Sequence, residues 1–431
     1  MSYLAQLVAR TRDILQLRFT DLFAQLPPTM LGGISPPNPV KRLIKVLGYA
    51  GVRLVGNALK PVHNAENLRG AIWLYVVSQN NYEALEFIRT GLPNSVFVAG
   101  QSKQIGRYNS HVNRLSLRRK LLYYWQFPLV LTGLWRTEGS RALRFFDLIF
   151  NAIGYYEVYV RALRHYKPKA IIFANDHNDD ARALLLAART CRIPTAYVQH
   201  ASVSTYFPPL SFDLSLLEGQ DALDKYRQCG PVQGRVELVG MPKADAFLRQ
   251  RNTAPVVQRV GIAVNLLDDT EAIRATVAAL LQAFPRITFT FRPHPGDTRD
   301  FGFLREYPQL LFSNARQQNV FEFLQQQDAL IAADTSTHLE ATLLNLASIY
   351  YRLGTHTVAD DYYGYVANGL VERAATLPEL GELLRRYEQH KPANLYQRAA
   401  YYNSTLGTPH EGHSKNIALD KLLDWIAKPY F

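Results

Sequence analysis

Cysteine is almost absent from this sequence, in which Cys191 and Cys229 are the only two. Two thiols are too few for a disulfide framework or a metal cluster, and they fit a reducing compartment. No apolar run reaches the ~18 residues that indicate a membrane-spanning helix. The first residues also lack a continuous apolar stretch followed by a small-residue cleavage site, so we expect no signal peptide. These absences together predict a cytoplasmic protein.

The common phosphate and metal motifs are missing as well. The sequence has no Walker lysine motif, and no Gly-x-Gly-x-x-Gly follows a predicted strand, which argues against a P-loop or a standard dinucleotide site. No His-Glu-x-x-His or Cys-x-x-Cys pair proposes a metal site. We therefore expect a site without a metal or a cofactor.

Positive charge, by contrast, is plentiful. Lys and Arg outnumber Asp and Glu by 48 to 36, which gives a formal net charge of +12. This balance favours a negative partner: nucleic acid, anionic lipid headgroups or a phosphorylated substrate. Many of these charges lie in amphipathic stretches of the N-terminal half, where a solvated helix face is the simplest explanation. They are Lys41, Arg42, Lys45, Arg53, Arg114, Arg118, Arg119 and Lys120.

The first helical stretch suggests a sharper hypothesis. Its apolar residues leave Arg10, Arg12 and Arg18 on other faces, a pattern typical of helices that lie on a membrane surface. The apolar residues are Leu4, Leu7, Val8, Ile14 and Leu15. We therefore predict that residues 1–60, read as helices broken by a proline-rich segment over 27–39, contact an anionic inner membrane surface.

At 431 residues the chain is longer than one core usually supports, so two domains are expected. After residue 60, short apolar runs alternate with helical periodicity, the pattern of a parallel, doubly wound α/β sheet. In the first cycle we expect strands over 71–77, 95–99, 169–176, 195–200, 213–219 and 236–240, and helices over 142–165 and 179–191. In the second cycle we expect strands over 260–267, 287–291, 329–334 and 347–351, and helices near 271–284, 319–326 and 337–345.

The two cycles predict two Rossmann-like domains that face a central cleft. We place a helical, basic segment at 1–60, an N-terminal domain at 61–240 and a C-terminal domain at 241–410. A last helix near 414–427, in the segment 411–431, is expected to pack back on the first domain. In such sheets ligands bind beyond the carboxyl ends of the strands, so the residues at those ends are the candidate site.

Two strand ends of the first domain carry histidine. Asp176 and His177 follow one strand, and His200 ends the next. A loop histidine at a strand end can act as a general base near neutral pH, although a hydrogen-bonded loop histidine is the simpler alternative. Two histidines at one sheet edge favour function. We therefore predict His200, Asp176 and His177 as the catalytic residues.

In the second domain, the strand over 287–291 leads into Arg292, Pro293, His294 and Pro295. Each proline removes a backbone donor and fixes φ, so the loop presents His294 rigidly. Rigid presentation is useful where an imidazole has to meet a phosphate or a leaving group. We therefore predict that Arg292 and His294 bind the phosphate of a nucleotide.

The strand over 329–334 is followed by Thr335, Ser336 and Thr337 directly before a helix. Hydroxyls and free N–H groups at a helix start can bind an anion. Thr337 and Glu340 also match a capping box, which would explain these two residues without a ligand. Ser336 and Thr335 are not needed for that cap, so the turn stays a candidate phosphate site.

Five short segments in this order and spacing resemble bacterial GT-B glycosyltransferases of surface-polysaccharide assembly. The likeness is strongest to enzymes that use CMP-activated ulosonic acids (sialic acid or Kdo) and to the CDP-glycerol glycerophosphotransferases. It covers residues 165–355, and the first 60 residues have no counterpart. The segments are ANDH (174–177), YVQHAS (197–202), GMPKAD (240–245), RPHPGD (292–297) and DTSTHLEA (334–341).

The resemblance implies roles for several residues. In such families the histidine of the His-Pro pair and the Ser/Thr turn contact the donor phosphate, which implies His294, Ser336 and Thr337. A glutamate in the helix after the turn often holds the ribose, which implies Glu340. An acidic residue or histidine of the first domain deprotonates the acceptor, which implies His200 or Asp176.

We therefore predict a metal-independent glycosyltransferase that moves an ulosonic acid from a CMP donor to a bacterial surface polysaccharide (capsule or lipopolysaccharide) or a lipid-linked glycan. The segment 217–219 departs from the acidic pair plus glycine of bacterial sialyltransferases, which argues against sialic acid. Three alternatives stay open: a CDP-glycerol or CDP-ribitol polyol-phosphate transferase, a nucleotide-sugar epimerase and a non-enzymatic nucleic-acid-binding protein.

The expected partners follow from this prediction. They are a nucleotide-activated sugar donor, a glycan or lipid-linked acceptor and an anionic membrane surface. Nucleic acid is not expected, because the sequence has no nucleic-acid motif and its basic residues are interspersed with acidic ones. We expect a cytoplasmic protein that is peripheral on the inner membrane.

Overall fold

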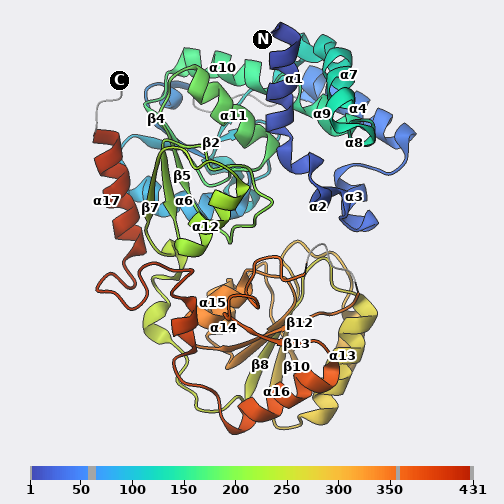
Figure 1. The fold of residues 1–431 in the computed structure, drawn as a ribbon, viewed down its shortest axis with the longest axis vertical. Coiled ribbons are helices and arrows are strands. Elements are labelled where there is room, and N and C mark those ends of the chain that lie inside the picture. Colours follow the sequence, from blue (N-terminus) through green and yellow to red (C-terminus); the bar gives the residue numbers. More distant parts are fainter. Residues whose placement is uncertain (1, 57–64, 356–359, 428–431) are drawn as a thin grey trace. The chain divides into compact units, whose positions relative to one another are not determined.

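The computed structural model describes residues 2–56, 65–355 and 360–427. The chain forms two compact units, which Figure 1 colours along the sequence. Unit 1 comprises residues 1–217, 223–238 and 415–431, and unit 2 comprises residues 218–222 and 239–414. Each unit is built on one all-parallel β-sheet.

Unit 1 contains sheet A, whose seven strands lie in the order β3-β2-β1-β4-β5-β6-β7. The central strands are buried along their whole length, which is why each appears in the sequence as a short continuous apolar run. The strands are β1 (Ile72–Tyr75), β2 (Ser95–Gly100), β3 (Asn113–Leu115), β4 (Ala170–Phe173), β5 (Thr195–Val198), β6 (Leu214–Leu217) and β7 (Arg235–Leu238).

Helical connections join the parallel strands of sheet A. α6 (Gln79–Gly91) leads from β1 to β2, α11 (Asp179–Thr190) from β4 to β5, and α12 (Gln220–Cys229) from β6 to β7. α17 (Ser414–Ala427) occupies the range predicted for the last helix. Lys421 of α17 forms an ion pair with Glu237 of β7 at 3.0 Å.

The N-terminal segment is helical over its described residues; 57–60 lie outside them. The proline-rich stretch over 27–39 does more than interrupt helices, because Pro28 and Pro39 each occupy a first helical turn. A proline fits there, since its missing N–H has no partner in the helix anyway. The elements are α1 (Tyr3–Ile14), η1 (Gln16–Phe19), α2 (Asp21–Ala24), α3 (Pro28–Ile34), α4 (Pro39–Gly51) and η2 (Val52–Gly56).

The prediction that α1 presents an apolar face to a membrane is wrong. α1 packs against α7 (Phe127–Glu138) and α11, and its apolar face belongs to the core of unit 1. Arg10 of α1 forms an ion pair with Glu157 at 2.7 Å, inside the same unit. Of the five apolar residues on which the prediction rested, Leu7, Ile14 and Leu15 are buried, whereas Leu4 is 39% exposed.

The single helix predicted over 142–165 is broken into several helices. Gly154 has a φ of 80°, in the left-handed region, and a Cβ at this position would lie 3.1 Å from Lys120 Cα. Only glycine accepts this backbone without strain, and a continuous helix cannot pass through it. The helices are α8 (Ser140–Arg144), α9 (Phe146–Ala152) and α10 (Tyr155–Tyr166).

Unit 2 contains sheet B, whose six strands lie in the order β10-β9-β8-β11-β12-β13. The strands are β8 (Arg259–Ala263), β9 (Thr288–Arg292), β10 (Leu310–Phe312), β11 (Ala329–Ala332), β12 (Ala347–Tyr351) and β13 (Glu372–Ala374). Its helices are α13 (Thr270–Ala283), α14 (Val320–Leu324), α15 (Thr337–Leu343) and α16 (Leu377–Gln389).

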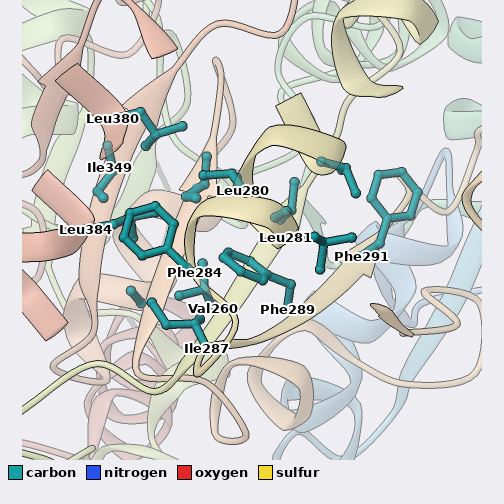
Figure 2. Packing of buried hydrophobic residues seen from close by; sticks show 14 of the residues in the cluster. Val260, Leu280, Leu281, Phe284, Ile287, Phe289, Phe291, Ile349, Leu380 and Leu384 are labelled. Carbon is teal, nitrogen blue, oxygen red and sulfur yellow. The ribbon is translucent and has the colours of Figure 1, made fainter. Parts of the chain in front are cut away.

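The core of unit 2 in Figure 2 gathers side chains from sheet B, α13 and α16. Phe289 and Phe291 of β9 are fully buried, and the same cluster contains Leu280 of α13 and Leu384 of α16. Burying a side chain of this size stabilises the fold by about 1.5–3 kcal/mol. The packed phenylalanines therefore fix β9, and with it the start of the loop that carries His294.

Both sheets are doubly wound. In sheet A the chain runs outward from β1 to β3 on one side and from β4 to β7 on the other; in sheet B it runs from β8 to β10 and from β11 to β13. The carboxyl ends of the strands at such a switch point are where open α/β sheets bind ligands. Two parallel Rossmann-like sheets confirm the predicted α/β class. No helix of the described residues is long and apolar enough to cross a bilayer.

A buried histidine joins three elements of unit 2. On α15, His338 Nε2–H donates to Ala333 O at 2.9 Å, after β11, and Nδ1 lies 2.7 Å from the hydroxyl of Ser348 on β12. Nε2 must hold a proton to donate to Ala333, so in the neutral ring Nδ1 accepts from the Ser348 hydroxyl. Burial lowers the pKa of His338 from 6.5 to about 4.

We expect His338 to make unit 2 sensitive to acid. Between pH 6.5 and about 4 the unfolded chain binds a proton that the folded chain excludes, so this contribution to stability is complete above pH 6.5 and falls with pH. The loss near pH 4.5 is about 2–3 kcal/mol. Urea unfolding of the parent and His338→Gln, near pH 7 and near pH 4.5, should show their stability difference shrinking by that amount. The exposed control His390→Gln should show no such change; a constant difference for His338→Gln would contradict the prediction.

Candidate functional site

A histidine and a buried carboxylate form a pair at the end of β4, at the switch point of sheet A. His177 Nδ1 lies 2.8 Å from Asp176 Oδ1. Asp176 is buried, whereas the His177 side chain keeps 27% of its surface exposed. Asn175 Oδ1 accepts the backbone N–H groups of His177 and Asn178, which fixes the loop that carries the pair.

The protonation of this pair follows from its surroundings. Burial alone would raise the pKa of Asp176, but the hydrogen bonds from His177 and Tyr226 outweigh it and lower the pKa. The carboxylate is therefore ionised and can only accept. Nδ1 of His177 must therefore carry a proton, and in the neutral tautomer of the ring Nε2 holds the lone pair.

Tyr226 of α12 completes the arrangement. Its hydroxyl donates to Asp176 Oδ2 at 2.6 Å and lies 3.2 Å from the hydroxyl of Tyr197 on β5. Burial raises the pKa of Tyr226 well above its usual value, so this phenol remains a donor. Tyr226, Asp176 and His177 thus form a hydrogen-bonded chain that ends in a partly exposed imidazole.

His200, at the end of β5, is held differently. Asn81 Nδ2, on α6, lies 3.0 Å from His200 Nε2 and 3.3 Å from Ala174 O. An amide nitrogen can only donate, so His200 Nε2 accepts and the proton is on Nδ1. The nitrogen that would act as a base is therefore already engaged, and His200 could take a proton there only by giving up Asn81.

In unit 2, the loop after β9 presents His294 with a defined tautomer. The backbone N–H of Gly296 donates to His294 Nδ1 at 3.0 Å, so the ring proton is on Nε2. Burial lowers the pKa of His294, while Asp297 opposes this effect. The ring therefore stays neutral at pH 7 and offers one N–H donor.

Arg292 is placed away from that donor. Its buried guanidinium donates to Ser313 Oγ at 2.6 Å and to Gln318 O at 2.8 Å, and it lies 5.0 Å from the ring centroid of Phe323. These bonds tie the end of β9 to the segment after β10. The sequence predicted that the Arg292 side chain binds a phosphate. In the structure its guanidinium instead holds the edge of sheet B together.

In the turn of Thr335, Ser336 and Thr337 after β11, the two threonines are hydrogen-bonded to each other, whereas the Ser336 side chain makes no capping bond. The Thr335 and Thr337 hydroxyls lie 3.1 Å apart, and Thr337 N–H donates to Thr335 Oγ1 at 3.3 Å. Ser336 is the N-cap of α15, yet its side chain makes no capping bond. Asp334 accepts from Tyr350 and from the backbone N–H of Tyr362, both at 2.8 Å, which anchors the turn.

The predicted capping box of Thr337 and Glu340 is absent, because Glu340 pairs with Lys243 instead. Glu218 lies near this pair: burial raises its pKa to about 7, and Lys243 partly counteracts this. Burial would lower the pKa of Lys243, but the charges of Glu340 and Glu218 raise it overall. Glu340 is thus held by a cation, which leaves its implied role toward a ribose as a prediction.

The sequence found the strand ends but missed several partners. Asp176 and His177 are brought together in unit 1, with His200 one strand away; in unit 2, His294 and the hydroxyl turn follow β9 and β11. Asn81 and Tyr226 were missed, since they carry no local motif. Lys243 stood in the GMPKAD segment and could have been found there. Among the described residues, no group of three or more His, Cys, Asp or Glu side chains could hold a metal ion.

Comparison with known proteins places this fold. No family model and no curated sequence matches the chain. A putative UDP-N-acetylglucosamine 2-epimerase from Listeria monocytogenes aligns with a TM-score of 0.54 and 10% identity, covering 84% of this chain and 98% of the other. The UDP-GlcNAc 2-epimerase from Neisseria meningitidis bound to UDP-GlcNAc aligns with a TM-score of 0.51 and 12% identity, covering 82% and 99%.

A second kind of enzyme has the same architecture. The wall teichoic acid polymerase TagF, in a structure with CDPG, aligns with a TM-score of 0.51 and 9% identity, covering 90% of this chain and 98% of the other. Such low identity speaks for the fold alone. The chain has the architecture of these GT-B enzymes, two parallel Rossmann-like sheets, and this confirms the predicted fold.

Proposed function

We propose that the chain is a nucleotide-sugar-dependent glycosyltransferase, in which unit 1 activates the acceptor and unit 2 binds the donor nucleotide. The observation that carries this proposal is the hydrogen-bonded chain of Tyr226, Asp176 and His177. A buried, ionised carboxylate that orients an accessible imidazole is a standard arrangement for a general base.

His177 is the base of the proposed reaction. Its Nε2 takes the proton of an acceptor hydroxyl while the acceptor oxygen attacks the donor sugar. The bond between the sugar carbon and the phosphate oxygen breaks, and its electron pair leaves with the nucleotide. Asp176 stabilises the imidazolium that forms, so it is a positioning residue. His200 ranks behind His177 because Asn81 already occupies its Nε2.

The donor side is built from neutral hydrogen-bond donors. His294 offers Nε2–H, and the turn of Thr335, Ser336 and Thr337 offers hydroxyls at the end of β11. Donors aimed at the phosphate stabilise the negative charge that develops on the leaving nucleotide. Arg292 supports this edge from inside the fold, and Glu340 is proposed for the ribose.

The narrower proposal is transfer of an ulosonic acid from a CMP donor to a surface polysaccharide or a lipid-linked glycan at the membrane. It rests on the sequence resemblance.

A polyol-phosphate transferase is the second candidate, favoured by one feature of sheet B. β8 lies between β9 and β11, so the two strand ends are ~10 Å apart. A diphosphate donor such as CDP-glycerol bridges this separation better than a single phosphate does.

The epimerase alternative differs in its need for an acceptor. An epimerase converts the free nucleotide sugar, whereas a transferase releases nucleotide only when an acceptor is present. Incubation of the protein with CMP-, CDP- and UDP-activated donors, with and without glycan acceptors, therefore separates the classes. Conversion of a UDP-sugar without any acceptor would overturn the transferase proposal.

We expect His177→Ala to lower turnover by about 10²–10⁴-fold, the usual cost of losing a general base, while leaving the Kd of the donor nucleotide unchanged. Asp176→Asn should cause a loss of similar size, because an amide can donate to His177 Nδ1 and move the proton to Nε2. Steady-state rates and the pH profile of kcat measure both effects.

Two variants serve as references for that experiment. His165→Ala removes an exposed histidine of unit 1 and should keep full turnover. His200→Ala should lose less activity than His177→Ala. The assignment is wrong if His177→Ala keeps near-normal turnover, or if His200→Ala alone abolishes it.

We expect His294→Ala to weaken binding of the nucleotide alone by about ten- to a hundredfold, since a hydrogen bond to a charged group contributes about 1.5–3 kcal/mol. Calorimetric titration with CMP, CDP and UDP measures the change and identifies the base and the number of phosphates. The exposed His390→Ala of unit 2 is the matched control and should bind as the parent does. Equal affinities of parent and His294→Ala would show that the loop is only a stiff turn.

A further inference from the structure

α4 turns its apolar side outward. Val40, Leu43, Ile44 and Leu47 follow the i, i+3, i+4, i+7 spacing of one helix face, and they are 62%, 54%, 62% and 64% exposed. A surface helix of a globular protein normally buries such a stripe against the core. In α4 the apolar face is therefore exposed to solvent, the opposite of the usual arrangement.

The basic side chains of α4 hold this orientation from the inner side. Arg42 is buried, donates to Arg144 O at 2.6 Å, and lies 5.2 Å from the ring centroid of Phe146. Lys45 lies 3.5 Å from the buried carboxylate of Asp147. If α4 rotated to bury its apolar stripe, Arg42 and Lys45 would lose these contacts and the carboxylate of Asp147 would lose its cation. A buried charge without a partner costs several kcal/mol. The outward stripe is thus a fixed feature of unit 1.

The apolar area extends beyond α4. η2 follows α4 directly and packs against η5 (Arg118–Gln126). Leu54 and Val55 of η2 and Trp125 of η5 are each 59% exposed. We call the α4 stripe and these three residues the α4 surface. Exposed apolar side chains gathered on adjacent elements mark binding sites for proteins or membranes.

Charge decides between those partners. Neither 22–65 nor 87–137, the stretches that contain α4, η2 and η5, includes a single Asp or Glu. Lys41, Arg118 and Arg119 on the same elements are exposed. A second copy of this surface would bring like charges together in a two-fold interface, which is unfavourable. An apolar area whose own elements carry exposed basic residues and no acidic ones complements anionic lipid.

We propose that the α4 surface docks unit 1 on an anionic lipid bilayer. The aliphatic side chains enter the boundary between headgroups and acyl chains, Trp125 lies at the headgroup level, and the exposed cations meet the lipid phosphates. The inference deepens the proposed function and rests on it for the lipid-linked acceptor that docking would bring within reach. It replaces α1, whose apolar face is buried, with a different surface.

The test is flotation of the full chain with phosphatidylcholine vesicles, with and without phosphatidylglycerol, in the absence of nucleotide. We expect the parent to bind only the anionic vesicles. Leu43→Gln/Ile44→Gln/Leu47→Gln should lower that binding roughly tenfold or more, because it removes apolar area from the contact. Arg118→Gln/Arg119→Gln should lower it by about fivefold per removed charge.

Matched controls lie in unit 2. Leu311→Gln/Phe312→Gln removes exposed apolar side chains of β10, and Arg249→Gln/Arg286→Gln removes two exposed charges. Both should bind anionic vesicles within about twofold of the parent. Thermal unfolding should show every variant to be folded, and the α4 and charge variants should match the parent, since their changed side chains are exposed. Binding by the α4 variant equal to that of the parent, or no vesicle binding by the parent, would overturn the proposal.

Two further measurements need no surface variant. Trp125 and Trp135 are exposed while Trp73 and Trp425 are buried, so brominated lipid in the anionic vesicles should quench the emission of the parent. Unchanged emission would count against docking. Light scattering should show a monomer; a parent dimer that the α4 variant dissociates would assign the surface to a second copy and overturn the lipid assignment. Since neither uses nucleotide, a failed transferase proposal leaves both results interpretable.

Discussion

The carboxyl edge of sheet A depends on the buried carboxylate of Asp176. An ionised carboxylate inside a protein costs several kcal/mol unless hydrogen bonds compensate it. Here the Tyr226 hydroxyl and His177 Nδ1–H supply those bonds. The same two bonds attach the loop after β4 to α12 and choose the tautomer of His177. Stability and chemistry are therefore coupled at this point: the hydrogen bond that allows the charge to be buried also engages Nδ1 of a partly exposed imidazole and leaves Nε2 as its second nitrogen.

The edge of sheet B in unit 2 also has buried ionisable groups, but there burial shifts their pKa values toward the neutral form. Burial raises the pKa of Asp268, after β8, to about 7, and it raises the pKa of Asp334 as well. His294 and His338 are neutral for the same reason. A carboxyl group whose pKa lies near 7, as for Asp268, repels an anion less than a fully ionised one, and a neutral imidazole can donate without needing a counter-charge. An edge of this kind suits a ligand that brings its own negative charge, whereas the edge of sheet A suits the acceptance of a proton.

The sequence predicted the strand ends well because parallel strands have their carboxyl ends at one edge; once ten strands were located by their apolar runs, His177, His200 and His294 had to lie at such edges. Three strands, β3, β10 and β13, were missed because each has three residues at a sheet edge, too few to form a pattern.

The partners of the site residues were not predictable either. Tyr226 is 50 residues from Asp176 in sequence, and Glu340 prefers Lys243 to the local cap that its spacing suggested. Local spacing indicates what a side chain can do, and tertiary contacts decide which option it takes.

α1 and α4 show the limit of periodicity most clearly, since both have an apolar face and basic residues on other faces. In α1 the apolar face enters the core and Arg10 reaches an acidic partner, Glu157, within unit 1. In α4, Arg42 points into unit 1, where it contacts the backbone carbonyl of Arg144 and the ring of Phe146, and the aliphatic stripe is exposed. Exposing four large aliphatic side chains forgoes about 1.5–3 kcal/mol each relative to burial. A helix that accepts this cost, and that is fixed in place by its own buried cation, is built for a partner that covers the stripe. Periodicity reports that a helix has two faces; the location of its charge partners determines which face the protein keeps for itself.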